Sequence, residues 1–141
     1  MKKQTLISAT LCLIVGLAMV SANPQAGGVK AKVPFSFAVS GEIFSAGDYI
    51  MIASSHQLKI EDAHGRIVAI LLANEVSGRS AGKNGQIIFH CYRDHCFLAE
   101  VWSPTQENGR RLAMSRAEAN LANEEKGKYF AVLGEEPLQR H

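Results

Sequence analysis

The chain has 141 residues, with 15 Lys and Arg against 13 Asp and Glu, and therefore a formal net charge of +2. That length is typical of one domain. The sequence has no Lys- or Arg-rich stretch interleaved with aromatic residues, so the electrostatic footprint of a nucleic-acid-binding protein is excluded. The same lack of a basic stripe argues against binding to membrane surfaces.

The first twenty-two residues, Met1–Ala22, have the organisation of a secretory signal peptide. Two lysines follow the initiator methionine, and Leu6–Val20 is an apolar run without a charged residue. Small residues at Val20 and Ala22 match the positions that a signal peptidase reads. We predict cleavage after Ala22, so that the mature chain begins at Asn23 and is periplasmic or secreted.

Two alternatives to cleavage remain open. The apolar run could be a retained membrane anchor, although its 15 residues fall short of the roughly 20 that span a bilayer as a helix. Cys12 could carry a lipid, although it follows the bulky Leu11 where a lipoprotein signal needs a small residue. Cleavage accounts best for the pattern, and it predicts no stable membrane insertion of the mature chain.

Cleavage removes 22 of the 141 residues and leaves 119. A chain of that length can bury a core without depending on disulfides or metal ions. It also removes two lysines, so the mature chain carries 13 basic and 13 acidic residues and no net charge. We predict a flexible lead-in at residues 23–32, one β-rich domain at 33–134 and a disordered tail at 135–141.

Period-two alternation indicates strands through most of the mature chain. Val33–Val39 alternates between apolar and small or polar residues, with Pro34 expected at a strand edge or start. Ile67–Ala73 is apolar at seven successive positions, which predicts a strand buried on both faces or closed into a barrel wall. Two hairpins and two single strands complete the β prediction: Leu58–Glu61 with Arg66–Ala73, Gln86–Tyr92 with His95–Trp102, Tyr49–Ala53, and Tyr129–Leu133.

One short helix is predicted near the C-terminus. Ser115 and Glu118 have the spacing of a capping box, and Gly127 stands where a helix end favours a left-handed residue. With about seven strands and one helix, the expected fold is mainly β: a small single-domain β-barrel or β-sandwich.

Three short motifs carry a resemblance to known proteins. Val33-Pro34-Phe35-Ser36-Phe37, Ala46-Gly47-Asp48-Tyr49 and Phe97–Trp102, followed by the late Ser-Arg-Ala-Glu helix, resemble an uncharacterised family of small, mostly-β exported proteins common in acidobacteria. The resemblance covers nearly all of the mature chain and implies a periplasmic or extracellular β-domain. That family has no established activity, so no functional role is carried over, and Cys91 and Cys96 depart from its usual pattern.

The stretch Gly78–Gly82 matches the G-x-S-x-G motif of serine esterases, with Ser80 as the nucleophile. That motif requires a strand-to-helix turn, whereas another strand is expected after Gly85. As a phosphate-binding loop the stretch also fails, because Asn84 stands where Ser or Thr must bind magnesium. A flexible polar loop over Ser77–Gly85 is the prediction.

His90, Cys91, His95 and Cys96 form the one cluster of metal-ligand residue types. In the predicted hairpin Cys91 lies opposite Cys96, which puts both sulfurs on one face and His90 on the other. An exported chain favours oxidised cysteines. We therefore predict a structural disulfide between Cys91 and Cys96, with free thiols and a metal site as the alternatives.

Glu100 shares a face with the apolar Leu98 and Trp102, where a carboxylate is costly unless it is paired. We expect an ion pair with a Lys or Arg, and as the alternative a catalytic Glu with His64 or His90. The aromatic residues on the strands could line a ligand pocket, but they are expected to form the core: Tyr49, Phe89, Phe97 and Trp102.

The sequence favours an exported, non-catalytic β-domain that acts by binding or by structure, with an unknown protein or a small apolar ligand as partner. We assign no catalytic residue, cofactor or metal ligand. The first alternative is a carrier that holds a small apolar ligand inside a barrel. A small hydrolase built on Ser80 and Glu100 is the other.

Overall fold

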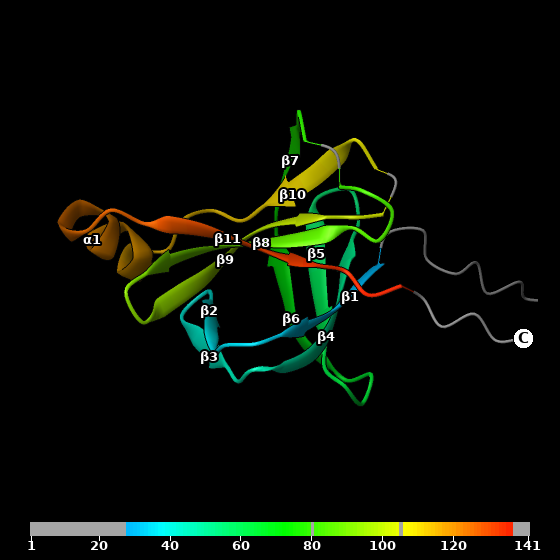
Figure 1. Cartoon of the computed structure of the whole chain (residues 1–141), viewed down its shortest axis with the longest axis horizontal. Coiled ribbons are helices and arrows are strands. Elements are labelled where there is room, and N and C mark those ends of the chain that lie inside the picture. The colour runs from blue at the N-terminus through cyan, green and yellow to red at the C-terminus, as the bar shows by residue number, and fades with distance from the viewer. Residues whose placement is uncertain (1–27, 80, 105, 137–141) are drawn as a thin grey trace, which may run out of the picture.

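The protein is described by a computed structural model over residues 28–79, 81–104 and 106–136 (Figure 1). This part is mostly β-strand with one helix, which confirms the mainly-β prediction. The predicted signal peptide, Met1–Ala22, lies outside the described residues. In chain order the elements are β1 (Gly28–Val33), β2 (Phe37–Val39), β3 (Glu42–Phe44), β4 (Gly47–Ala53), β5 (Gln57–Glu61), β6 (Ile67–Leu72), β7 (Asn74–Ser77), β8 (Gln86–Tyr92), β9 (His95–Trp102), β10 (Asn108–Arg111), α1 (Arg116–Glu124) and β11 (Lys128–Leu133).

The described residues contain eleven strands, where the sequence predicted about seven. The alternating stretch from Val33 to Val39 is not one strand, because β1 ends at Val33 and β2 begins at Phe37. Ser40 and Gly41 both have positive φ, at 50° and 85°, as a two-residue type I′ turn requires, and they join β2 to β3. The short strands β7 and β10 pair where the sequence indicated only polar breaks.

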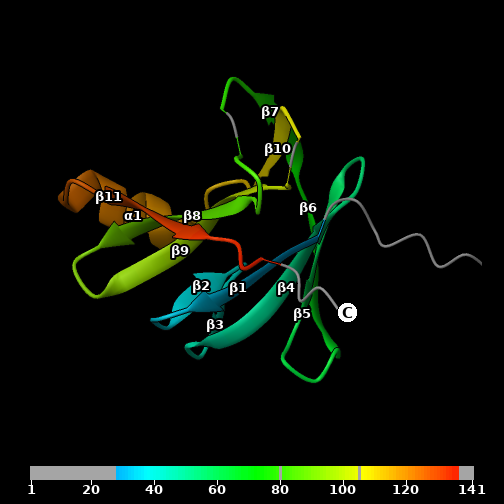
Figure 2. The same cartoon turned by 45° about the vertical axis from the view of Figure 1, so that its right-hand side comes forward.

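The strands form two sheets. One has the order β1-β4-β5-β6, and the other follows the path β11-β8-β9-β10-β7, with β2 pairing both β9 and β3. The chain passes from one sheet to the other at Ala73, between β6 and β7. In Figure 2, β7 lies beside β10, whereas β6 runs away from β10 along β5.

Within the described part of the chain the predicted closed barrel is not found, because the two sheets are open. Near β1, the Glu135 N–H donates to the Lys30 C=O at 2.7 Å, but no strand ladder joins β1 to β11. The second opening lies between β6 and β10. Strand β10 pairs with β7 but ends at Arg111, so that β6 pairs with β5 alone among the described strands.

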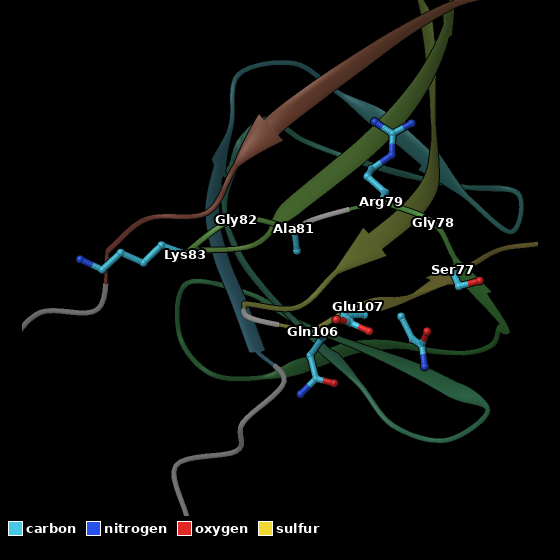
Figure 3. A pocket seen from close by; sticks show the side chains of 9 residues that line it. Ser77, Gly78, Arg79, Ala81, Gly82, Lys83, Gln106 and Glu107 are labelled. Atoms are coloured by element: carbon cyan, nitrogen blue, oxygen red, sulfur yellow. The ribbon is translucent and has the colours of Figure 1, made fainter.

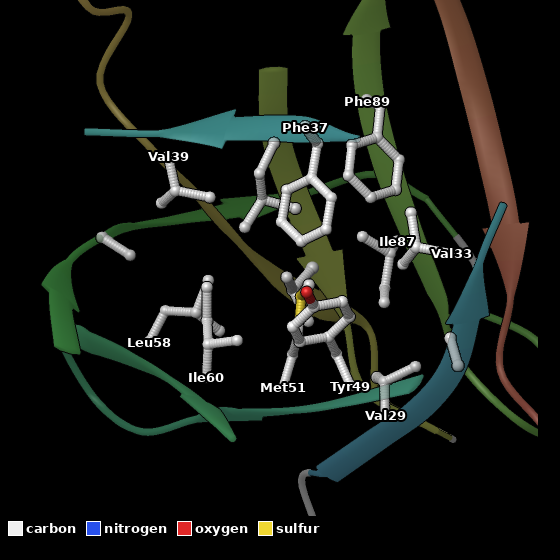
Figure 4. Close-up of a cluster of buried hydrophobic side chains, with 14 of the residues drawn as sticks. Val29, Val33, Phe37, Val39, Tyr49, Met51, Leu58, Ile60, Ile87 and Phe89 are labelled. Atoms are coloured by element: carbon white, nitrogen blue, oxygen red, sulfur yellow. The ribbon is translucent and has the colours of Figure 1, made fainter. Parts of the chain in front are cut away.

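A single large apolar cluster fills the space between the sheets (Figure 4). Phe37 lies at its centre and contacts the rings of Tyr49 and Phe89 edge-on, with centroids 5.2 and 5.3 Å apart. A second, smaller cluster surrounds Trp102 on the opposite face of the β8–β9 sheet. The prediction that the strand aromatics form core is confirmed for Tyr49, Phe89 and Trp102, and Phe97 is buried as well.

The prediction for Ile67–Ala73 was wrong. Only one face of β6 packs on the core, and Ile67, Ile70 and Leu72 on the other face are 55%, 59% and 80% exposed. An uninterrupted apolar run resembles a doubly buried strand in sequence, but here it forms a sheet edge with one solvent face.

The structure differs from the predicted lead-in at residues 28–32 and from the predicted tail at residues 135–136. Residues 28–32 belong to β1, where Val29 and Ala31 are fully buried, so the alternating pattern begins earlier than we expected. At the other end, the Glu136 carboxylate pairs with Lys83 at 3.2 Å. Residues 23–27 and 137–141 lie outside the described residues.

The predicted helix is confirmed, with two differences at its ends. The Ser115 hydroxyl accepts from the Glu118 N–H at 3.2 Å, but the Glu118 carboxylate bonds to β8 instead of closing the capping box. Gly127 does not adopt the predicted left-handed conformation. Instead, the missing side chain lets the backbone at Gly127 lie close to the Tyr92 ring, because a Cβ there would come within 2.6 Å of that ring.

Candidate functional site

A cavity of about 660 Å³ lies between the polar loop after β7 and the segment before β10 (Figure 3). Arg79 and Lys83 line it, but their side chains point in different directions and do not converge on a common point. Ser80 of the G-x-S-x-G stretch lies outside the described residues. The segment after Gly85 is strand β8, as predicted, so the strand-to-helix turn of an esterase is not formed.

Glu100 is held by a structural ion pair, as expected. The expected face was wrong in part, because the β8–β9 register shifts between Ile88 and Phe89 and leaves Glu100 and Trp102 on the face opposite Leu98. The Glu100 side chain is 8% exposed. Oε1 accepts from Arg111 Nε and Nη2 at 3.0 and 2.8 Å, and Oε2 accepts from Trp102 Nε1 at 2.8 Å. Burial by itself would raise the pKa of Glu100. The hydrogen bonds from Trp102 and Arg111 and the charges of Arg111 and Arg79 outweigh it and hold the pKa below its usual range. No histidine takes part in this pair.

A second polar cluster attaches helix α1 to the sheet. Glu118 Oε1 lies 3.0 Å from His90 Nδ1 and accepts from the Tyr92 hydroxyl at 3.3 Å. The rings of His90 and Tyr129 are perpendicular, with their centroids 4.2 Å apart. Burial, and then the Glu118 charge, raise the pKa of Tyr92. Glu118 is the buried residue of a mostly polar helix, so this cluster replaces an apolar helix face as the attachment.

The disulfide between Cys91 and Cys96 is confirmed. The two residues face each other in the β8–β9 ladder, one step inside the closing pair Tyr92–His95, and His90 lies on the opposite face. A disulfide indicates an oxidising, non-cytoplasmic environment. In the part of the chain that the structure describes, no group of three His, Cys, Asp or Glu side chains is placed to hold a metal ion.

We expect thiol reagent to label neither cysteine in the unfolded, unreduced mature protein. Replacing both by serine should lower the free energy of unfolding by about 2 kcal/mol, because the bridge closes a short loop in the unfolded chain. Urea unfolding of the two forms measures the difference. Two labelled thiols in the wild-type protein would contradict the bridge.

The apolar edge strand β6 is the candidate binding surface. The Ala73 N–H donates to the His56 C=O at 2.9 Å, so the backbone of Ala73 faces β5. Because backbone groups alternate in an antiparallel ladder, those of Ile70 and Leu72 face away from β5. Edge strands are normally protected by charges, proline or a covering segment. From Ile67 to Leu72 this strand carries neither a charge nor a proline.

Sequence reasoning found Glu100, the cysteines and the His90 orientation but missed β6 as a surface. It also missed Glu118, whose capping-box spacing suggested a role inside its own helix. The available signal was the apolar run at Ile67–Ala73, but such a run is typical of a strand buried on both faces and does not reveal an exposed one.

Comparison of the chain with protein families, with curated proteins and with solved structures found no match. Across the described residues, no helix is long and apolar enough to span a membrane.

Proposed function

We propose that the mature chain is an exported, non-catalytic β-domain, periplasmic or secreted, that acts by binding through strand β6. The observation that carries the proposal is an apolar strand that, among the residues the structure describes, pairs on one side only and exposes three large apolar side chains. Contiguous exposed apolar surface of this kind marks interaction sites. The resemblance to small exported acidobacterial proteins agrees with the export of the chain alone, and it stays a prediction.

The carrier alternative needs a chamber lined by inward-facing side chains. The inward side chains of both sheets pack on one another in the apolar cluster around Phe37, and the cavity beside the loop after β7 is lined mostly by polar and glycine residues. The barrel in which a ligand was expected to lie is open. These observations favour a binding surface over an internal ligand.

Native mass spectrometry of the mature protein, isolated from its own periplasm or medium, tests the proposal. We expect a stoichiometric added mass of polypeptide with the wild-type protein, and its loss with Leu72→Lys, which puts a charge on the exposed edge. Leu133→Lys is the matched control, because Leu133 is 71% exposed on β11, in the other sheet. A bound apolar small molecule would support the carrier instead.

A further inference from the structure

The free edge of β6 faces the same side as β10. The Leu112 N–H donates to the Ala99 C=O at 2.9 Å, so alternation turns the backbone of Arg111 toward β7, where it pairs with Asn74. Asn74 therefore turns its backbone groups toward β10. By the same alternation along the continuous chain, Leu72 and Ile70 turn theirs to that side as well.

β10 ends at Arg111, so the position beside Ile70 and Leu72 has no strand among the described residues. The chain after Arg111 does not continue along β6, because Leu112 bonds to β9. A strand placed there would extend the line of β10. If it ran in the direction of β10 it would be antiparallel to β6, which is the more stable pairing.

The side chains along this edge define the chemistry of an incoming strand. Ile70 and Leu72 share the solvent face, and the pairing of Arg111 with Asn74 puts Arg111 on that face too. Its guanidinium bonds Glu100 through Nε and Nη2, with Nη1 outside that pair, and the Arg111 side chain is 58% exposed. The edge thus offers an uncharged apolar strand with a cation at one end.

Resting on the binding function proposed above, we propose that the free edge of β6 binds an extended apolar peptide, antiparallel to β6, with an acidic side chain at the peptide's N-terminal end beside Arg111. Backbone hydrogen bonds to Ile70 and Leu72 hold the peptide, and its alternate apolar side chains pack along theirs. The carboxylate adds a charge-assisted hydrogen bond to the guanidinium.

A second copy of the chain fits this position less well. If two β6 strands paired antiparallel, Arg66 of the copy would approach Arg111, and like charges repel. The chain of the copy continues beyond its β6, so it would also have to pass the end of β10. A short peptide can end there instead.

The test measures fluorescence anisotropy of a labelled, N-acetylated hexapeptide, Glu-Val-Val-Thr-Val-Val, with the mature protein. We expect saturable binding. Replacing the Glu of the peptide by Gln should lower the affinity about fivefold at low salt, and high salt should remove this difference. N-methylation of the alternate peptide residues whose N–H groups face β6 removes backbone donors, and it should lower the affinity about tenfold.

Leu72→Pro should weaken binding by about tenfold or more, since it removes an outward N–H. The fold should survive, because proline is tolerated where the N–H faces away from the ladder. Circular dichroism and Trp102 emission check folding, and if this variant does not fold, the N-methylated peptide still decides the question.

Equal binding of the N-methylated and parent peptides would overturn the proposal, as would unaltered binding to folded Leu72→Pro. A dimer in sedimentation equilibrium that Leu72→Pro abolishes would assign the edge to a second copy and also overturn it. A native partner that Leu72→Lys releases, with no binding of the hexapeptide, would overturn the peptide assignment while the binding function stands.

Discussion

Replacing Arg111 by alanine should lower the free energy of unfolding by about 2–3 kcal/mol at pH 7, because it leaves the Glu100 carboxylate buried with Trp102 as its remaining partner. This expected loss is smaller than the largest losses caused by breaking a buried ion pair, because the Arg111 side chain is more than half exposed. Urea unfolding followed by the emission of the single tryptophan measures the loss.

The loss should depend on pH with a defined sign. The pKa of Glu100 is lowered in the folded protein, so its ionised form stabilises the fold above the unfolded pKa of about 4.3. This contribution disappears as the pH falls through the lower, folded pKa. The difference between wild type and Arg111→Ala should therefore be full at pH 7 and shrink at strongly acidic pH.

The matched control is Arg66→Ala, which removes an exposed arginine from Asp62. Asp62 keeps hydrogen bonds from the backbone N–H groups of His64 and Arg66, so a loss within about 0.5 kcal/mol is expected. Glu100→Gln in the Arg111→Ala background should recover part of the stability, since the amide oxygen can still accept from Trp102. Equal losses for the two alanine variants would show that Glu100 is not a buried charge.

The elements that sequence reasoning located best are those whose signals are local. The β8–β9 hairpin has the predicted bounds because alternation and the Arg93-Asp94 turn lie within one continuous stretch. Its register then fixed the Cys91–Cys96 bridge and the side on which His90 lies. Helix α1 begins after Ser115 for the same reason, since its N-cap is a contact across three residues.

What the sequence could not show depends on partners distant in the chain. Whether the apolar run at Ile67–Ala73 is covered depends on β10, which ends at Arg111 and leaves β6 exposed. Gly127 had the position of a helix end, but its contact is the Tyr92 ring on another strand. Closure into a barrel is equally a property of all the strands together, and no local pattern reports it.

Gly109→Ala should lower the free energy of unfolding by about 2–3 kcal/mol through overpacking. Gly109 pairs with Trp102 across the β9–β10 ladder, and a Cβ there would lie 2.6 Å from the indole ring. The indole cannot easily move, because it is 2% exposed and donates to Glu100. Displacing it would also weaken that hydrogen bond, so the tryptophan emission should shift to longer wavelength in the native state.

Gly28→Ala is the matched control for this substitution. A Cβ at Gly28 would lie 3.7 Å from the side chains of Ile50 and Ile52, which is ordinary contact, in a strand that alanine can adopt. Its stability should therefore change by no more than about 0.5–1 kcal/mol, in either direction. If both alanine variants unfold at the same urea concentration with unchanged emission, Trp102 does not pack against Gly109.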